Sequence, residues 1–406
     1  MPKKLLQINS TANWGSTGKI AEQIGLVAME AGWESYIAYG RSANSSKSKL
    51  IKVGSKLGVM WHGVLSRLFD CHGLASNVAT KRLVKQIRQI KPDIIHLHNI
   101  HGYYLNYKIL FDYLNGANIP VVWTLHDCWA FTGHCAHFVS VDCMRWRDGG
   151  CEKCPLKNRY PKSYTDFSAR NFRLKKSLFT SNLNLHIVTA SEWLQQYVNQ
   201  SFLKNSDVVT IYNGVDLQVF KEKGDFPESV KKTENDRVVL GVSSVWTASK
   251  GLDDFKQLRQ QLPLDVKIVL VGLKPGQIQD LPEGIIGVER TQNVAELAGY
   301  YELADVFVNP TYADTFPTVN LESLACGTPV ITYKTGGSPE AVTPETGVVV
   351  EQGDLAALCD AIEDVFNKRK DFYKDACRKR AEECFDKNKC FEKYLELYNE
   401  ILNNNK

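Results

Sequence analysis

Two carboxylates stand eight positions apart in the stretch "DTFPTVNLE", which runs from Asp314 to Glu322. An apolar run at 305–311 precedes this stretch and small residues follow it, which favours a strand, a loop holding Asp314 and a helix holding Glu322. The first amides of that helix, at Thr318 and Val319, would lack intrahelical partners and could bind an anion. Carboxylates accept hydroxyl donors well, so the pattern suits a sugar beside an anion. The alternative is a pair of helix-capping acids.

Two other loops carry glycines after a strand-like run. "NWGSTGKIA" places Gly15 and Gly18 after the first apolar run, and "SSVWTASKG" places Lys250 and Gly251 after the run at 237–244. Glycine lets a backbone approach a phosphate closely, and a lysine at a helix start can meet a diphosphate as a point charge. Tight turns between strand and helix also need glycine for structural reasons, and a lone lysine is usually a surface residue.

Histidines follow two further runs. His126 ends the run at 121–127, where it could act as an acid or base or orient a hydroxyl group. His96, His98 and His101 alternate along the run at 93–98 and into the next loop. We expect one or two of these three to face a ligand, and His96 to be a hydrogen-bonded core residue.

The cysteines are concentrated in one region. Of eleven in the chain, five lie close together in the sequence: Cys128, Cys135, Cys143, Cys151 and Cys154. The last four of these could form a tetrahedral structural zinc site, with His134 and His137 as substitute ligands. Packed free thiols, or disulfides formed after isolation, are the alternative.

The length of 406 residues favours two domains. Strand-like runs alternate with helical patterns in both halves, which predicts parallel sheets covered by helices. These runs lie at 4–8, 35–40, 93–98, 121–127, 186–191 and 208–214 in the first half, and at 237–244, 266–272, 305–311 and 329–335 in the second.

The two halves join near "YNGVD" (212–216), and the polar tract at 221–237 is predicted to be a linker. Near the C-terminus, a helical pattern has an apolar face that must pack against another element. This face consists of Phe391, Tyr394, Leu395, Tyr398 and Leu402.

The composition, with 44% hydrophobic and 23% charged residues, is typical of a globular protein, and no apolar run reaches the length of a membrane span. The N-terminus lacks the apolar stretch of a signal peptide, so we expect a cytoplasmic protein. The net charge of +4 identifies no partner.

A basic, aromatic segment lies between Lys157 and Lys176, where seven Lys or Arg residues accompany the single acid Asp166. Four aromatic residues are interleaved with them. Such a segment suits an anionic surface, such as a bilayer or a pyrophosphate head group. The alternative is a solvated helix face beside a core stripe.

Taken in order, "TLHD", "YNGVD", "SKG", the Asp-x7-Glu stretch and "CGTPVITYKTGGSPE" resemble the family-4 retaining glycosyltransferases of the GT-B fold. The segment "TLHDCWAFTGHCAHF" followed by "CEKCP" further resembles the branch that builds bacterial capsule, exopolysaccharide and lipopolysaccharide. The resemblance implies two Rossmann-like doubly wound domains facing a cleft. The first would span 1–214 with a returning C-terminal helix at 386–406, and the second, at 215–385, would bind a nucleotide-sugar.

The resemblance also implies roles for individual residues. Glu322 would bind the ribose hydroxyls and Asp314 the hydroxyls of the donor sugar. Lys250 and the amides of Thr318 and Val319 would neutralise the diphosphate.

In the first domain, His126 would face the donor sugar, and Gly15 and Gly18 would lie near the phosphates. Two departures from the family pattern stand out: members usually have Glu at position 314, and many have an arginine where Ser243 and Ser244 stand. Arg290 is a possible substitute for that arginine.

The activity implied is transfer of a hexose-type sugar, with retention, from a UDP- or GDP-linked donor. The acceptor would be a glycan or a polyprenyl-diphosphate-linked chain at the cytoplasmic face of the inner membrane. The leaving diphosphate would itself help to remove the acceptor proton, so no cofactor is required. A nucleotide-sugar epimerase or a phosphorylase of the same fold is an alternative. So is a zinc-bearing nucleic-acid-binding module, although we expect no nucleic-acid partner.

Overall fold

The computed structural model describes residues 2–147, 149–182, 184–223, 230 and 236–404. The chain divides into two compact units, Met1–Tyr212 with Phe391–Lys406, and Asn213–Cys390. Most of the tract at 221–237, predicted to be a linker, lies outside the described residues. We describe each unit by itself.

The first unit is built on a seven-stranded parallel sheet of order β3-β2-β1-β4-β5-β6-β7. Its elements are β1 (Lys4–Asn9), α1 (Gly15–Glu30), β2 (Glu34–Tyr39), β3 (Lys49–Lys52), α2 (Lys56–Phe69), α3 (Asn77–Ile90), β4 (Ile94–Leu97), α4 (Tyr107–Leu114), β5 (Val121–Leu125), η1 (Trp129–Phe131), η2 (Val139–Val141), α5 (Ser168–Phe179), β6 (Leu185–Thr189), α6 (Glu192–Val198) and β7 (Asp207–Thr210).

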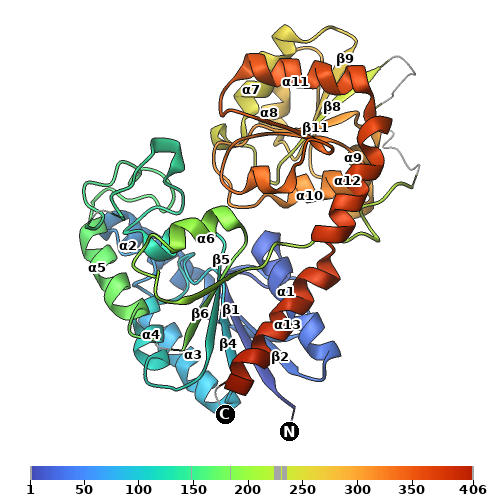
Figure 1. Cartoon of the computed structure of the whole chain (residues 1–406). Coiled ribbons are helices and arrows are strands. Elements are labelled where there is room, and N and C mark those ends of the chain that lie inside the picture. Colours follow the sequence, from blue (N-terminus) through green and yellow to red (C-terminus); the bar gives the residue numbers. More distant parts are fainter. Residues whose placement is uncertain (1, 148, 183, 224–229, 231–235, 405–406) are drawn as a thin grey trace. The chain divides into compact units, whose positions relative to one another are not determined.

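Helices cover both faces of this sheet. One core contains residues of α3, α4, α5 and α6, such as Leu83 and Phe179. On the opposite face, α1 packs beside the C-terminal helix α13 (Lys387–Asn404), whose Phe391, Tyr394 and Tyr398 are buried. The predicted apolar face of the last helix therefore packs against the first unit, and Figure 1 shows α13 lying along it.

The second unit has a six-stranded parallel sheet of order β10-β9-β8-β11-β12-β13. Its elements are β8 (Arg237–Val242), η3 (Ala248–Lys250), α7 (Leu252–Gln261), β9 (Val266–Val271), α8 (Pro275–Gln279), β10 (Ile285–Val288), α9 (Val294–Leu303), β11 (Val306–Asn309), α10 (Thr318–Ala325), β12 (Val330–Tyr333), η4 (Ser338–Ala341), β13 (Gly347–Val350), α11 (Leu355–Lys368) and α12 (Lys370–Cys384). In Figure 1, α7 and α11 lie on one side of the sheet, with α9, α10 and α12 on the other.

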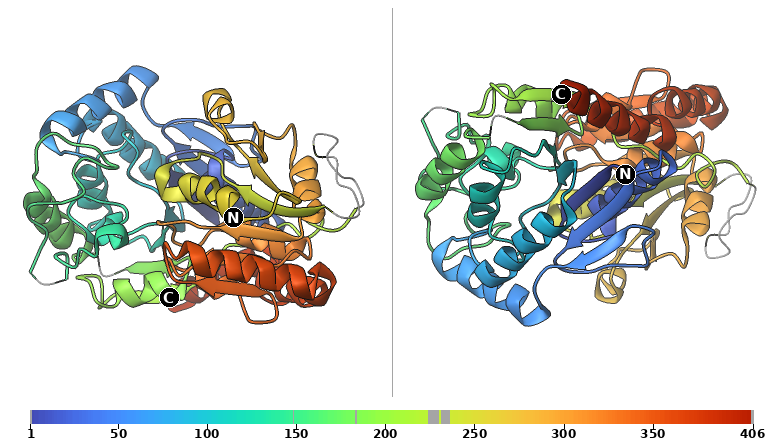
Figure 2. Two further views of the ribbon diagram at one scale, coloured as in Figure 1. Left: turned by 90° about the horizontal axis from the view of Figure 1, so that it is seen from above. Right: turned by 90° about the horizontal axis from the view of Figure 1, so that it is seen from below.

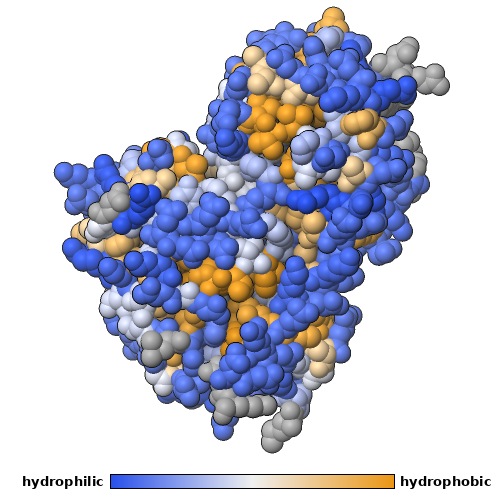
Figure 3. All heavy atoms as spheres, in the orientation of Figure 1, coloured by the Kyte–Doolittle hydropathy of each residue, from blue (hydrophilic) through white to orange (hydrophobic). Residues whose placement is uncertain are grey.

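Both units are therefore doubly wound α/β domains, as predicted, and all ten predicted strands are present. Three strands were missed: β3, β10 and β13. Most of the surface visible in Figure 3 is hydrophilic, with apolar residues gathered in a few patches.

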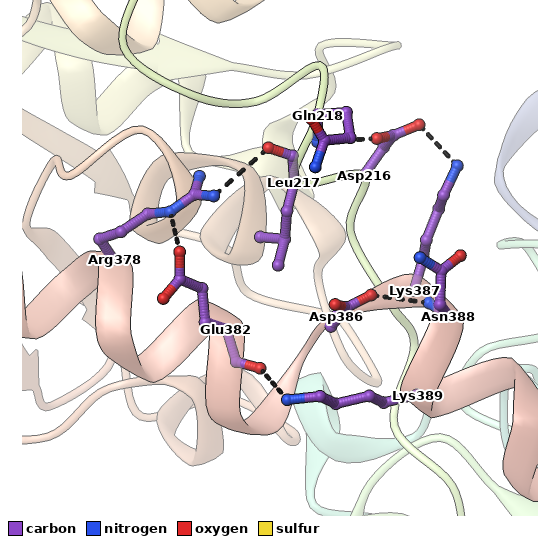
Figure 4. A pocket seen from close by; sticks show the side chains of 9 residues that line it. All are labelled: Asp216, Leu217, Gln218, Arg378, Glu382, Asp386, Lys387, Asn388 and Lys389. Atoms are coloured by element: carbon purple, nitrogen blue, oxygen red, sulfur yellow. Dashed lines mark hydrogen bonds and ion pairs between the residues drawn. The ribbon is translucent and has the colours of Figure 1, made fainter.

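A polar joint ties together the ends of the second unit. Val215 donates its N–H to Phe385 O (2.8 Å) and accepts from Lys387 N (3.1 Å). Lys387 also pairs with Asp216 at 2.7 Å. A pocket of about 340 Å³ lies here, drawn in Figure 4 and lined by Asp216, Leu217, Gln218, Arg378, Glu382, Asp386, Lys387, Asn388 and Lys389. Because Lys387 pairs with Asp216, Arg378 pairs with Glu382 and no predicted site residue lines the pocket, we interpret the joint as structural.

Candidate functional site

The predicted donor residues lie at the point where the strand order of the second sheet reverses. β8 and β11 are neighbours there, although two strands separate them in the chain. The segment after β8 leads to Lys250, and the segment after β11 holds Asp314 and leads to α10, which begins at Thr318. In open parallel sheets, ligands bind outside the carboxyl ends of strands at this reversal.

Lys250 and Asp314 form an ion pair. Nζ of Lys250 lies 2.6 Å from Oδ2 of Asp314, and both side chains keep partial access to solvent. The close approach of the segment after β8 to the segment after β11 requires a glycine at position 251. Gly251 has φ +73°, and a Cβ there would lie 2.4 Å from the carbonyl oxygen of Pro310. The structure thus brings two predicted site residues together across 64 positions of sequence.

The start of α10 offers polar groups to a ligand. Its N-cap is Pro317, and none of the described residues caps the helix with a side chain. The backbone N–H of Thr315 donates to Oδ1 of Asp314 (2.9 Å). The hydroxyl of Thr315 is buried and has no hydrogen-bond partner among the described residues. Buried hydroxyl groups normally have a partner, so Thr315 is a candidate site residue that the sequence did not reveal.

Glu322 lies one turn into α10 and is half-buried. The buried hydroxyl of Tyr301 donates to its Oε2 at 2.9 Å. Burial, together with the negative charge of Glu322, raises the pKa of Tyr301 well above its ordinary value. Tyr301 therefore remains a hydrogen-bond donor that orients the carboxylate, which spacing alone could not predict.

A buried amide and hydroxyl network fixes α10 against the sheet. Asn320 accepts from Nδ2 of Asn309 (2.8 Å) and donates to Oγ of Ser338 (3.1 Å), which in turn bonds Thr332 (2.8 Å). The loop before Ser338 also lies close to the backbone of Asp314, since a Cβ on Gly336 would lie 1.7 Å from the carbonyl oxygen of Asp314. Sequence reasoning missed these positioning residues.

In the first unit, Gly15 and Gly18 lie at the start of α1, after β1, which neighbours β4 where that sheet's order reverses. Gly15 has φ +66°. A Cβ on Gly18 would lie 2.7 Å from Oγ1 of Thr11. Backbone conformation at Gly15 and close packing at Gly18 therefore each explain why a glycine stands there. A contact of these two glycines with phosphate stays a prediction.

The histidines after β4 and β5 form a chain of contacts. Nε2 of His126 lies 3.2 Å from Nδ1 of His98, whose Nε2 lies 3.0 Å from Oε1 of Gln7. His96 is fully buried between Thr124 (2.7 Å) and Tyr398 of α13 (2.6 Å), as predicted for a core residue.

Burial determines the charge of these rings. It lowers the pKa of His126 to about 4 and that of His96 and His98 well below the ordinary value. All three are therefore neutral at pH 7. A neutral His126 can orient a hydroxyl group but is a poor acid, which favours the orienting role over the acid–base role.

A second contact chain beside these histidines was missed. Nε2 of His101 lies 3.0 Å from Oδ2 of Asp127, and its Nδ1 lies 3.1 Å from the hydroxyl of Tyr160. Although burial opposes ionisation, the attraction of His101 and its hydrogen bond hold the pKa of Asp127 well below its ordinary value. Asp127 is thus a fixed negative charge next to the histidine.

The four cysteines of the predicted zinc site surround one small cavity together with His134. All four are free thiols. Among the described residues, however, no group of three or more His, Cys, Asp or Glu side chains could hold a metal ion. Nδ1 of His134 is bound to Asp70 at 2.6 Å. The four thiols and His134 therefore share one cavity but lack the arrangement of a metal site in the described part of the chain, and both the structural zinc and the packed thiols stay predictions.

Two other predictions have mixed outcomes. Arg290 is exposed after the edge strand β10, and β9 separates that strand from β8, so its role stays a prediction.

The two parts of the basic segment differ in burial. Within α5, Lys175 and Phe172 are buried, and Nζ of Lys175 donates to the carbonyl oxygens of Trp129 and Thr132. α5 therefore has an exposed basic face beside a buried stripe, as in the helix-face alternative, except that Lys175 belongs to the buried stripe, while residues 157–167 stay largely at the surface.

Two family models match most of the chain. Residues 30–219 match the model described as "Glycosyltransferase Family 4", and residues 236–368 match "Glycosyl transferases group 1". The chain is also 25% identical over 372 residues to the colanic acid biosynthesis glycosyl transferase WcaC of Escherichia coli K12, covering 87% of this chain and 89% of the relative.

Solved structures resemble the whole chain. Sucrose-phosphate synthase from Thermosynechococcus elongatus has a TM-score of 0.72 at 18% identity, covering 98% of this chain and 99% of that one. Anabaena HepE in complex with UDP-glucose has a TM-score of 0.64 at 17% identity, covering 98% and 99%. These likenesses establish the fold as GT-B.

With two parallel-sheet domains that each match a glycosyltransferase model, the chain belongs to the GT-B class of glycosyltransferases. Its first domain is of the glycosyltransferase family 4 type, and its second is of the group 1 type.

Proposed function

We propose that the chain is a retaining glycosyltransferase that moves a hexose-type sugar from a nucleoside-diphosphate sugar to a lipid-linked surface glycan. The observation that carries the proposal is the convergence of Lys250, Asp314 and the start of α10 at the sheet reversal of the second unit. The UDP-glucose bound to the structural neighbour HepE supports a nucleotide-sugar donor. The role of WcaC in colanic acid biosynthesis supports a bacterial glycan product.

Each group has a distinct task in this proposal. Lys250 and the amides of Thr318 and Val319 neutralise the diphosphate, because fixed cations and helix-start amides stabilise negative charge that grows during reaction. Glu322, oriented by Tyr301, accepts from the ribose hydroxyls. Asp314 holds Lys250 in place and accepts from a hydroxyl of the sugar.

The chemistry follows from stabilising the leaving group. The bond between the anomeric carbon and the β-phosphate oxygen breaks, and a bond to the acceptor oxygen forms on the same face of the sugar. The acceptor proton passes to the departing phosphate oxygen, so the reaction is balanced without a metal ion. Neutral His126 orients a hydroxyl group of the donor sugar.

The donor is UDP- or GDP-linked in this proposal, and the acceptor is a glycan or polyprenyl-diphosphate-linked chain at the cytoplasmic face of the inner membrane. The surface-exposed basic and aromatic residues of 157–167 support an anionic surface as partner. None of the described helices combines the length and the hydropathy that a membrane-spanning segment requires.

A thermal-shift panel of nucleoside diphosphates and nucleotide-sugars tests the donor, because a ligand that binds only the folded state raises the melting temperature. We expect one nucleotide-sugar to raise it clearly. Transfer from that donor to a glycan acceptor should then give a product with the donor's anomeric configuration by NMR. An inverted product, or glycan cleavage driven by inorganic phosphate, would contradict the proposal, the latter in favour of a phosphorylase.

A further inference from the structure

Helix α2 of the first unit has its apolar residues on the outside. Six large apolar side chains are between 42% and 77% exposed: Leu57, Met60, Trp61, Val64, Leu68 and, at the last position and outside the stripe formed by the other five, Phe69. The buried residues of the same helix are polar, namely His62 and Ser66. This is the reverse of the arrangement expected for a helix that packs on a core.

Five of these exposed residues form one stripe. At 100° per residue, positions 57, 60, 61, 64 and 68 fall within about 100° of the helix circumference, and His62 and Ser66 fall on the opposite side. The helix is 14 residues long, so the stripe extends over roughly 20 Å. It is a continuous apolar face rather than a set of scattered residues.

Hydrogen bonds on the buried side fix this orientation. Nδ1 of His62 lies 2.8 Å from Oγ of Ser76, and Nε2 of His62 accepts from Gly73 N at 3.1 Å. Ser66 Oγ donates to the carbonyl oxygen of His62 at 2.8 Å. Rotating the helix to bury the apolar stripe would break these hydrogen bonds of His62 and Ser66. The apolar stripe therefore faces outward.

The stripe continues into the loop at 160–167. Tyr164 N donates to Arg67 O (2.7 Å) and Thr165 Oγ1 donates to Leu68 O (2.9 Å), so the loop lies against the C-terminal end of α2. Tyr160, Tyr164 and Phe167 are 46%, 63% and 41% exposed. We call α2 and this loop together the apolar–basic surface.

The exposed charges of this surface are basic, and its one acid, Asp166, is half-buried and accepts from the backbone N–H groups of Cys154 and Ser168. Residues 49–69 and 157–165 contain basic residues and no acid. Lys56 and Arg67 are exposed on one flank of the stripe, and Arg159 and Lys162 are exposed in the neighbouring segment. In both views of Figure 2, α2 lies at the periphery of the first unit.

We propose that the apolar–basic surface docks the protein on an anionic phospholipid bilayer, with α2 lying in the plane of the interface. An apolar helix face with a central Trp, flanked by Lys and Arg, is the composition of interfacial helices, and the basic flank attracts acidic lipids. A second copy of the chain fits less well, because a two-fold interface would bring the same basic flanks together.

The apolar–basic surface also contacts one of the histidines of the candidate site, His101. Tyr160 belongs to this surface, and its hydroxyl lies 3.1 Å from His101, which contacts Asp127. On the proposed function, a lipid-linked acceptor lying in the bilayer would reach this end of the first unit without leaving the membrane. The docking itself does not depend on glycosyl transfer.

Co-sedimentation with vesicles tests the docking. The full chain is mixed with vesicles of phosphatidylglycerol and phosphatidylethanolamine, or of phosphatidylcholine alone. The test variant is Leu57→Ser with Trp61→Ser. The matched control is Leu264→Ser with Phe372→Ser, which also removes two exposed apolar side chains, 96% and 65% exposed, but from the second unit. Nucleoside-diphosphate binding and the melting temperature of every variant are measured in parallel.

We expect the wild type and the control to bind the anionic vesicles, with binding weakened by salt and by neutral lipid. The α2 variant should bind at least about tenfold more weakly, with unchanged nucleotide binding and melting temperature. Equal binding by the test and control variants, or no binding by the wild type, would overturn the docking while leaving the donor site untouched. A wild-type dimer that the α2 variant dissociates would assign the surface to a second copy instead.

Discussion

The ion pair between Lys250 and Asp314 defines the site at the scale of single residues. The carboxylate of Asp314 lies 2.6 Å from Nζ of Lys250. A diphosphate that reaches Lys250 must therefore share the cation with Asp314. The sequence predicted both residues, but the pairing depends on two loops that only the fold brings together.

Thr315 offers a sharp test at this scale, because its hydroxyl is buried without a partner among the described residues. Thr315→Val removes an unsatisfied polar group, so stability should be unchanged or increase by about 1 kcal/mol. If the hydroxyl serves the ligand, nucleoside-diphosphate binding should weaken by about fivefold to tenfold. Melting temperature and calorimetric titration measure the two effects. Unchanged binding would remove Thr315 from the site.

Tyr301→Phe tests the orientation of Glu322. It deletes the hydroxyl that donates to Oε2 of Glu322 at 2.9 Å but keeps the buried ring. A hydrogen bond to a charged group contributes about 1.5–3 kcal/mol, so nucleotide binding should fall by about tenfold or more. Tyr300→Phe, on a buried neighbour in α9, is the control by titration. Equal effects of the two substitutions would indicate general loosening of the helix and contradict the role of Tyr301.

At the scale of elements, the strands predicted from apolar runs were found because they lie in the middle of the sheets or carry long apolar runs. The three missed strands, β3, β10 and β13, are each only four residues long and lie at sheet edges. Three of the four residues of β3 are exposed. A half-solvated edge strand needs no continuous apolar run, which explains β3 (KLIK), whereas β10 (IIGV) and β13 (GVVV) are apolar but are short runs that contain a glycine.

The same limit applies to α5. Its lysines predicted a solvated or membrane-facing segment, yet Lys175 is buried over the ring of Trp129 at 3.4 Å. Burial lowers the pKa of Lys175 to about 7. Whether a lysine points outward depends on the carbonyl groups that tertiary structure places around it, and spacing does not reveal these.

Gly336 and Gly353 form a matched pair for testing the loop that supports the site. Both have positive φ, but a Cβ on Gly336 would lie 1.7 Å from Asp314 O, whereas a Cβ on Gly353 would make an ordinary contact, 3.6 Å from Tyr312. Gly353→Ala should cost about 1–2 kcal/mol and leave binding intact. Gly336→Ala should cost more and abolish nucleotide binding. Chemical denaturation and titration measure both, and similar behaviour of the pair would contradict the supporting role of the loop.

At the scale of the whole molecule, the buried histidines of the first unit link stability to pH. Burial lowers the pKa of His62 and of His126 to about 4. The unfolded chain binds protons on these residues below about pH 6.5, and the folded chain does not. Their contribution to stability is therefore complete above about pH 6.5 and is lost as the pH falls towards about 4.

We expect the free energy of unfolding of the first unit to fall by about 1.4 kcal/mol per pH unit for each such histidine across this range. His62→Asn should reduce the pH dependence of the free energy of unfolding by the contribution of one histidine. Ser76→Ala removes a hydrogen-bond partner of His62 and should lower stability without reducing the slope. Denaturation at several pH values measures this, and identical slopes for wild type and His62→Asn would be the contrary result.

The most direct test of the central claim is whether Lys250, Glu322 and the start of α10 bind one nucleotide. Calorimetric titration compares the nucleoside diphosphate selected by the panel with its nucleoside. Glu322→Gln should weaken both ligands about equally, because both carry the ribose, whereas Lys250→Ala should weaken only the diphosphate, by about tenfold to a hundredfold. Glu383→Gln, an exposed carboxylate on α12, is the control. The account fails if neither site variant differs from that control, or if Lys250→Ala weakens nucleoside and diphosphate alike.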